Sequence, residues 1–422
     1  MEKIEKLKNK SNRYRIFKGV ITKYLESYTE GHLKIKLQDG ETIEVGNKES
    51  ENTAIINVHN PIFFKKVVIT GDIGFAESYM DGDWSTPDLK EIFLWAIKNI
   101  EHSGLISGTK KKKKSINLLA YTNKINHLLN SNTLNGSKRN ISYHYDLSNK
   151  FYEYMLDPTM TYSCGVFDQS NDLESSQIRK YELITKSLGV KNGDSVLEIG
   201  CGWGGYARYL NEQFDNLDYT GVTISKEQLE FAKNSLNKMN LKNNSISFEF
   251  EDYRNLTGKF DKIVSIEMIE AVGHNNYPEY FNKIDELLTK NGVATIQAIT
   301  SPDSRYDQIR TSADFIQKHI FPGSLLPSIR AITNACIDNS LHIFEIKDIG
   351  LHYAKTLNKW HEYFLKHWGE IEDLGFNDVF KRKWSYYLRY CEAAFETRNI
   401  STQQITLIKP NNTTHHQLEV LK

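Results

Sequence analysis

A glycine-rich loop follows a short apolar segment at residues 196–205, VLEIGCGWGG. Gly200, Gly202 and Gly205 reproduce the spacing G-x-G-x-x-G, in which glycine lets the backbone approach a ligand closely. A loop of this kind between a strand and a helix is typical of a site for a nucleotide-containing cofactor. The spacing alone does not distinguish a dinucleotide from other cofactors of this class.

The acidic residue that a dinucleotide requires is missing from its expected place. It should follow the loop by about 20 positions, at the end of the second strand, where it binds the ribose hydroxyls. The second predicted strand instead ends with GVTIS at 221–225, and Asp218 lies at its beginning. Glu198 lies inside the first strand, two positions before the first glycine. This arrangement resembles motif I of S-adenosylmethionine-dependent methyltransferases, whose cofactor has no pyrophosphate.

Seven longer segments occur in one order along the chain and extend this resemblance. They are YHYDLSNKFYEYMLDPTMTYSCGVF (143–167), VLEIGCGWGG, VTISKEQLEFAK, EDYRNL, IEMIEAVGHNNYPEYF, DFIQKHIFPGSLLPS and YYLRYCEAAF. Together they resemble the cyclopropane fatty acid synthase family, which includes the mycolic acid cyclopropane synthases. The segment ITGDIGFAESYMDGDWSTPDL at 69–89 is similar to that family's small N-terminal domain.

The family resemblance implies a set of contacts to S-adenosylmethionine. Tyr162 and Ser163 would lie near the methionine end, and Glu198 would lie behind the loop. The loop itself would follow the cofactor through Gly200, Cys201, Gly202, Gly204 and Gly205. Thr223 and Gln228 would hold the ribose in place of the missing acid, and Asp252 and Tyr253 would flank the adenine.

The resemblance also implies the reaction and its base. In the family, the methyl carbon is added to a cis double bond of a phospholipid acyl chain, which leaves a carbocation. A base then removes a proton from the new methyl group, and the ring closes. That base is a bicarbonate ion held by five positions, of which four match: Cys164, Glu270, Ile299 through its backbone, and Tyr353. The fifth is a histidine in the best-known members and Gln297 here, which can donate a hydrogen bond but cannot ionise. This departure leaves open a product other than cyclopropane.

Two further residues near these motifs have open roles. Glu267 precedes Glu270 by three residues and would share a helix face with it if the segment is helical. We expect Glu267 to be a solvent-facing or supporting carboxylate rather than a catalytic one. Cys391 falls at a family position considered for an active-site cysteine, but a buried, small apolar side chain is an equal interpretation. No histidine pair has metal-ligand spacing with supporting carboxylates, so we predict no metal site.

The elements that must position these residues follow from the pattern of the chain. From about residue 180, strands and helices alternate regularly, which predicts βαβ units and a mostly parallel sheet. We therefore predict the α/β fold class, with a Rossmann-like methyltransferase domain at 136–405 and a C-terminal tail at 406–422. Residues 1–103 predict a small α+β domain for lipid handling or dimerisation. The intervening 104–135 is expected to be a linker, whose lysines 110–114 are either solvated or in contact with an anionic membrane.

Composition narrows the class of protein. The chain has 422 residues, 39% hydrophobic and 25% charged, which is typical of a soluble globular protein with two domains. Its 53 basic and 53 acidic residues balance, so no overall field favours nucleic acid. The charged start MEKIEKLKNK predicts no signal peptide, and four separated cysteines predict reduced thiols. We expect a cytoplasmic protein, peripheral on the inner face of the membrane, with a phospholipid surface and a second copy of the chain as partners.

The expected function is that of a cyclopropane-fatty-acyl-phospholipid synthase that uses S-adenosylmethionine. The main alternative is a related lipid C-methyltransferase that gives methyl-branched or methylene chains. A small-amine N-methyltransferase is disfavoured by the N-terminal domain, because small amines need no lipid-delivering module. A non-catalytic lipid-binding protein is disfavoured by Glu270, Tyr353 and the complete glycine loop.

Overall fold

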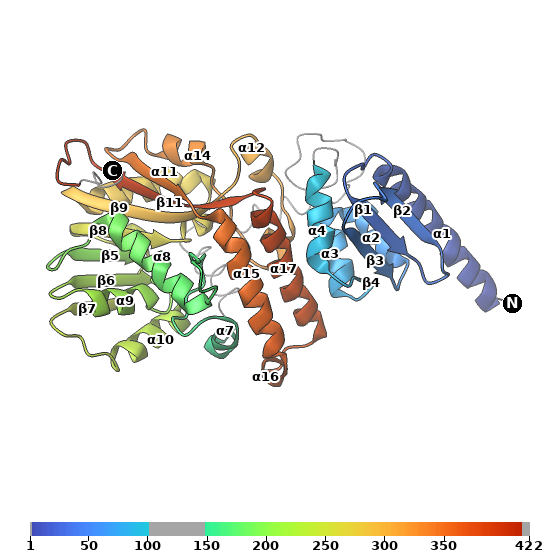
Figure 1. The fold of residues 1–422 in the computed structure, drawn as a ribbon. Helices are drawn as coiled ribbons and strands as arrows, with labels where there is room; N and C mark the ends of the chain where they lie inside the picture. The colour runs from blue at the N-terminus through green and yellow to red at the C-terminus, as the bar shows by residue number, and fades with distance from the viewer. Residues whose placement is uncertain (1, 101–147, 416–422) are drawn as a thin grey trace. The chain divides into compact units, whose positions relative to one another are not determined.

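The computed structural model describes residues 2–100 and 148–415, which form two compact units (Figure 1). The first unit contains the described residues up to 100 together with Ser304–Ile320 and Ile371–Asn399. The second contains the described residues 148–303, 321–370 and 400–415. The linker predicted at 104–135, with its lysine run, and residues 143–147 of the YHYDLSN motif lie outside the described residues.

Within the described residues, the second unit is built on a seven-stranded sheet of order β10-β11-β9-β8-β5-β6-β7. The strands are β5 (Ser195–Ile199), β6 (Asp218–Thr223), β7 (Ser245–Phe250), β8 (Phe260–Ile266), β9 (Leu288–Thr300), β10 (His342–Asp348) and β11 (Ser401–Ile408). Strands β5 to β9 pair in parallel, whereas β11 is antiparallel to β9 and β10. The predicted α/β class with a mostly parallel sheet is confirmed. Because β5 pairs with both β6 and β8, the strand order reverses at β5, where ligands bind in such sheets.

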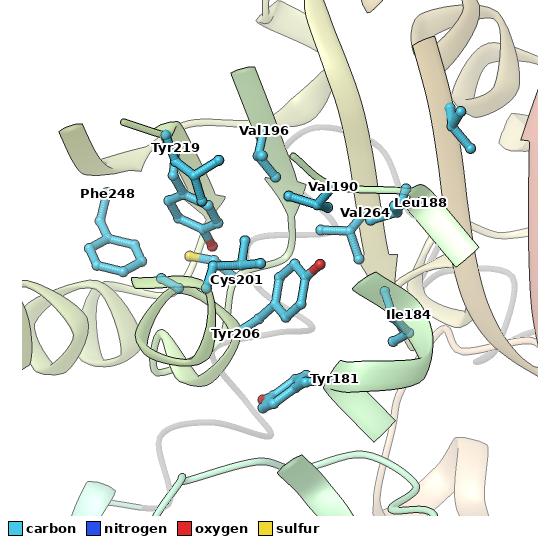
Figure 2. Packing of buried hydrophobic residues seen from close by; sticks show 14 of the residues in the cluster. Tyr181, Ile184, Leu188, Val190, Val196, Cys201, Tyr206, Tyr219, Phe248 and Val264 are labelled. Carbon is cyan, nitrogen blue, oxygen red and sulfur yellow. The ribbon is translucent and has the colours of Figure 1, made fainter. Parts of the chain in front are cut away.

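Helices cover both faces of this sheet. They are α7 (Asn149–Met155), α8 (Leu173–Leu188), α9 (Gly205–Gln213), α10 (Lys226–Leu236), α11 (Tyr277–Leu287), α14 (Ile329–Ala335) and α15 (Gly350–Lys366), with short 3-10 turns η2 (Tyr253–Asn255), η3 (Ile269–Ala271) and η4 (His274–Asn276). Figure 2 shows the core on one face, where Tyr181 and Ile184 of α8 and Tyr206 of α9 face Val196 and Val264 of the strands. On the other face of the sheet, α11 packs on β9 and α14. Crossover connections are right-handed, so a helix that follows the reversal of strand order at β5 lies on the opposite face.

Helix α8 shows how local sequence sets an element that carries part of the site. The Asp172 side chain caps its N-terminus by accepting a hydrogen bond from the Ser175 amide at 2.8 Å. Gly189 ends it in the left-handed conformation with a φ of 62°. Between these caps, Leu173, Ile184 and Leu188 recur at helical spacing and are buried. The inward face of α8 is therefore fixed relative to the sheet.

In the first unit, the described residues form a four-stranded sheet of order β2-β1-β3-β4 with helices. Its strands are β1 (His32–Lys36), β2 (Thr42–Gly46), β3 (Thr53–Val58) and β4 (Trp84–Ser85). Its helices are α1 (Glu2–Leu25), α2 (Ile62–Thr70), α3 (Asp72–Met80), α4 (Leu89–Lys98), α12 (Tyr306–Ile309), α13 (Phe315–His319) and α17 (Asp378–Glu396), and α16 (Trp368–Asp373) spans the boundary in the chain. None of the helices in the described ranges is both long and apolar enough to cross a bilayer.

The extents of the two units differ from the predicted domain boundaries. The predicted catalytic domain covers all of 136–405, but α17 packs on α3 and α4 of the first unit. There Tyr386 meets the Phe93 ring with centroids 4.8 Å apart, a contact between residues distant in sequence. At the other boundary, β11 extends to Ile408, so the predicted tail at 406 begins inside a strand of the large sheet.

Candidate active site

The glycine loop joins β5 to α9, and its glycines have different structural roles. Gly200, Gly202 and Gly204 have φ values of 83°, 52° and 80°, which favour glycine. A Cβ on Gly204 would lie 2.9 Å from the Phe248 ring, and one on Gly205 would lie 2.5 Å from Tyr181 Oη. These two glycines therefore allow the loop to pack on the core. A Cβ on Gly202 would meet nothing within 4 Å, so its backbone faces open space, as close approach of a cofactor requires.

Glu198 lies behind this loop, inside β5. It is buried and accepts a hydrogen bond from the Tyr219 hydroxyl on β6. Burial raises the pKa of Glu198 to about 7. Cys201 is buried beside it, and burial raises the pKa of its thiol, so it is a small packing residue there rather than a thiolate.

The next two strands end in the residues predicted for the ribose and adenine. At the end of β6, Thr223 Oγ1 donates to Gln228 Oε1 at 3.0 Å, and both side chains are buried. After β7, the Asp252 carboxylate accepts from Arg254 Nε and Nη2 at 2.8 and 2.7 Å and caps η2. Asp252 thus stabilises the turn that carries Tyr253. Thr223 ends β6, which hydrogen-bonds to the glycine loop through Val222, and Gln228 lies on α10. Asp252 and Tyr253 follow β7, and the ligand contacts of all four residues stay predictions.

The residues predicted for the methionine end lie between α7 and α8. The Tyr162 ring packs against Tyr152 and Trp360, with centroids 5.4 and 4.9 Å apart. Ser163 is buried, and its hydroxyl accepts a hydrogen bond from Lys180 Nζ at 2.8 Å. These contacts fix the segment that leads into Cys164.

Lys180 itself is a site residue that sequence analysis missed. Its side chain is fully buried on the inward face of α8, and burial lowers its pKa to about 8. The nearby carboxylates, Glu267 foremost, oppose this shift. The available signal was a lysine at an inward helical position, four residues before the buried Ile184, since lysine is almost never fully buried without a partner.

Glu267 is the centre of the candidate site. Its Oε1 accepts from the Cys164 amide at 2.9 Å and from Gln297 Nε2 at 2.8 Å, and its Oε2 accepts from the Tyr353 hydroxyl at 2.6 Å. The expectation of a solvent-facing carboxylate is wrong, because three donors from three separate segments converge on Glu267. The alternative expectation, a supporting carboxylate, stays a prediction. The shared helix face is also wrong: β8 ends at Ile266, Glu267 has a φ of 51°, and Glu270 belongs to η3. Residue spacing alone carried no signal for this arrangement.

Glu270 lies beside this group in a different environment. Its Oε1 accepts from the Ile299 amide at 2.5 Å, whereas its Oε2 is buried without a hydrogen-bond partner. Burial, together with the charge of Glu267, raises the pKa of Glu270 to about 8. Glu270 is therefore mostly protonated at neutral pH, and its free oxygen can donate a hydrogen bond.

The structure thus brings together Cys164, Gln297 and Tyr353 around Glu267, and Ile299 at Glu270. Cys164 contributes its amide, because burial raises the pKa of its thiol well above the ordinary value. Cys391 instead lies on α17 in the first unit, where burial raises its thiol pKa, so its active-site role stays a prediction. Across residues 2–100 and 148–415, no group of three or more His, Cys, Asp or Glu could hold a metal ion.

The glycine loop and the carboxylate cluster are neighbours. Strand β5 pairs with β8 in parallel, so the carboxyl ends of both strands lie at one edge of the sheet. A Cβ on Gly200 would lie 3.0 Å from Cγ of Met268, the residue between Glu267 and η3. The loop therefore lies next to the segment that carries the two carboxylates.

Comparisons with known proteins agree with this geometry. Residues 132–405 match the family described as "Mycolic acid cyclopropane synthetase". The "Tuberculostearic acid methyltransferase UfaA1" of Mycobacterium tuberculosis is 33% identical over 90% of this chain and 89% of its own length. The "Cyclopropane-fatty-acyl-phospholipid synthase" of Escherichia coli K12 is 36% identical over 83% of this chain and 87% of its own.

A solved structure extends the likeness to the fold. The mycolic acid cyclopropane synthase CmaA1, solved in complex with SAH and CTAB, is 30% identical with a TM-score of 0.60, over 64% of this chain and 98% of that chain. Its bound SAH is what remains of S-adenosylmethionine after methyl transfer, in keeping with the open backbone at Gly202. The chain therefore belongs to the mycolic acid cyclopropane synthetase family and is an S-adenosylmethionine-dependent methyltransferase.

Proposed function

We propose that this enzyme joins the methyl carbon of S-adenosylmethionine to a cis double bond of an unsaturated phospholipid acyl chain and closes a cyclopropane ring. The observation that carries the proposal is the pair Glu267 and Glu270 beside the glycine loop. One carboxylate is held by three donors, and the other has one buried oxygen without a hydrogen-bond partner. The E. coli relative named for this product supports the choice of substrate.

The cofactor supplies an electrophilic methyl group on a sulfonium when bound. An alkene is a poor nucleophile, so the protein must hold the double bond in line with that methyl and exclude water. Tyr162 packs beside Tyr152 and Trp360. The Trp360 ring also packs against Tyr353, with ring centroids 5.9 Å apart. These aromatic faces can stabilise the positive charge that develops on the acyl chain.

The carbocation is then discharged by loss of a proton from the new methyl group. Two candidates exist for the proton acceptor: a bicarbonate ion, as the family resemblance implies, and the carboxylate of Glu267, which holds three of the donors predicted for that ion.

A second candidate product is a methylene or methyl-branched chain. The relative named tuberculostearic acid methyltransferase supports it, as does Gln297 at the position where a histidine was expected. A 1,2-hydride shift to the cationic carbon, followed by loss of a proton from the new methyl, would give the methylene group. Loss of a proton from a neighbouring chain carbon would give a methyl-branched alkene, and a saturated branch would require a separate reductant.

We propose further that the enzyme works at a phospholipid surface from the cytoplasmic side, as a peripheral protein and a homodimer. The support is the chemistry of the substrate, because unsaturated acyl chains reside in the bilayer, and the family resemblance. The balanced charge of the chain gives no reason to expect nucleic acid as a partner.

Mass spectrometry with deuterated cofactor tests the product directly. The full chain is incubated with S-adenosylmethionine carrying a CD3 group and with vesicles of cis-monounsaturated phospholipid. A ring or a methylene group retains two deuterium atoms, whereas a methyl-branched alkene or a saturated branch retains three. Of the two products that retain two, only the ring resists mild hydrogenation. Binding of cofactor with no deuterium in any lipid would contradict the proposal.

A further inference from the structure

We infer that the carboxylate of Glu267 takes the place of bicarbonate as the base that removes the proton in this enzyme. The inference rests on the proposed function, since it assigns the acceptor within that reaction. It states which group removes the proton from the new methyl group, and it is based on the contacts of Glu267 and its neighbours.

Glu267 already occupies the set of donors predicted for the ion. The Cys164 amide, the Gln297 amide nitrogen and the Tyr353 hydroxyl all donate to its carboxylate, at 2.9, 2.8 and 2.6 Å. A side-chain carboxylate and bicarbonate share the same planar pair of oxygens, so one set of donors suits either. Here the protein supplies the carboxylate itself.

The orientation of Gln297 is set for this pairing. Gln404 on β11 donates its amide nitrogen to Gln297 Oε1 at 3.1 Å. With its oxygen engaged there, Gln297 presents its NH2 group to Glu267. Gln297, which stands where a histidine was expected, is thus a neutral hydrogen-bond donor to the carboxylate of Glu267.

Bicarbonate does not fit the residues present. Three of its predicted ligands are engaged with Glu267, and the Ile299 amide donates to Glu270. A further anion would face the charge of Glu267 at short range, which costs free energy in a buried site. The buried cation there, Lys180, donates to Ser163. No step of this mechanism therefore passes through bicarbonate.

Glu267 has three hydrogen-bond donors that favour its ionised form, whereas Glu270 has one. Burial raises the pKa of Glu267, while Tyr353, Cys164, Gln297 and the Lys180 charge oppose that shift. Glu270 has a single amide donor and a pKa of about 8, so it holds the proton of the pair. An ionised carboxylate next to a neutral one is the state that can accept a proton.

The step balances with the groups named. The bond between sulfur and the methyl carbon breaks, its electrons stay on sulfur, and the alkene electrons form the new bond to that carbon. A C–H bond of the new methyl then breaks and its electrons close the ring onto the cationic carbon. The proton passes to Glu267, which later releases it to solvent, so no oxidant or reductant is required.

Removal of bicarbonate from the wild-type enzyme is the first test and needs no variant. Turnover of cis-monounsaturated phospholipid vesicles is measured in buffer stripped of carbon dioxide, with and without added bicarbonate. We expect equal rates, within about twofold. A wild-type rate that collapses without bicarbonate and returns with it would overturn the inference while leaving the proposed function intact. No lipid product under either condition would instead mean failure of the proposed function.

Glu267→Gly is the second test, because the φ of 51° at this residue suits glycine and the lost side chain leaves a carboxylate-sized space among three donors. We expect turnover to fall by about 10²–10⁴-fold, the usual contribution of a positioned base, with cofactor affinity retained. Added formate or bicarbonate should restore part of the rate. The matched control is Asn171→Gly, with a φ of 52° in a loop away from these contacts. A Glu267→Gly enzyme with near wild-type turnover would refute the assignment.

Discussion

Substitution of Gly202 by valine tests where the cofactor lies. Gly202 has a φ of 52° and open space beyond its Cα, so two separate effects are expected. A side chain in the left-handed region costs about 1–2 kcal/mol of stability. In addition, the branched side chain would fill the space through which the cofactor approaches the backbone. We expect cofactor affinity to fall at least about tenfold, which is about 1.4 kcal/mol.

Gly193→Val separates these two effects. Gly193 also has positive φ, 88°, and open space around its Cβ position, but it lies in the turn before β5 rather than in the glycine loop. Both variants should therefore lose a few degrees of melting temperature. Titration calorimetry with S-adenosylmethionine should show weakened binding for Gly202→Val alone. Two variants with the same melting temperature and the same wild-type affinity would refute the placement of the cofactor.

Three further predictions concern the charges of the site. Glu270→Gln should lower turnover by less than about tenfold, because the amide keeps the neutral hydrogen-bond donor of the protonated carboxyl, and should leave cofactor affinity nearly unchanged in calorimetry. Folding raises the pKa of Glu270 from about 4.5 to about 8, so the contribution of this residue to stability falls as pH rises through that window. The melting temperature of Glu270→Gln should therefore decline less between pH 5 and pH 8 than that of the wild type. Parallel melting curves for the two proteins would contradict this. Lys180→Met removes the cation that favours ionised Glu267, so the acidic limb of the pH–rate profile should move to higher pH. The melting temperature should also fall, because the buried charge of Glu267 loses its cation, and an unmoved limb would argue for a purely structural lysine. Tyr353→Phe removes one donor to Glu267 and should lower turnover about tenfold at neutral pH, with wild-type cofactor affinity as the internal control.

Much of the fold was predictable because it depends on short-range patterns. Alternating apolar strands and amphipathic helices predicted the parallel sheet, and the glycines of the loop predicted a strand-to-helix turn at β5. Local caps such as Asp172 and Gly189 were likewise encoded in a few neighbouring residues. The division into units was not predictable in this way, because α17 reaches α3 and α4 through contacts between residues about 300 positions apart in the chain.

The sequence by itself determined the family, the cofactor class and most of the residues that surround the site. Only the tertiary structure decided what those residues do for one another. Glu267 looked helical and peripheral because its spacing from Glu270 is three residues, yet the chain turns sharply between them. Cys164, Gln297 and Tyr353 come from a loop, a strand and a helix far apart in sequence, and a hydrogen bond depends on positions in space within a few tenths of an ångström. Residue types limit which partners are possible, but only the packing of the sheet and its helices selects one carboxylate as their common acceptor.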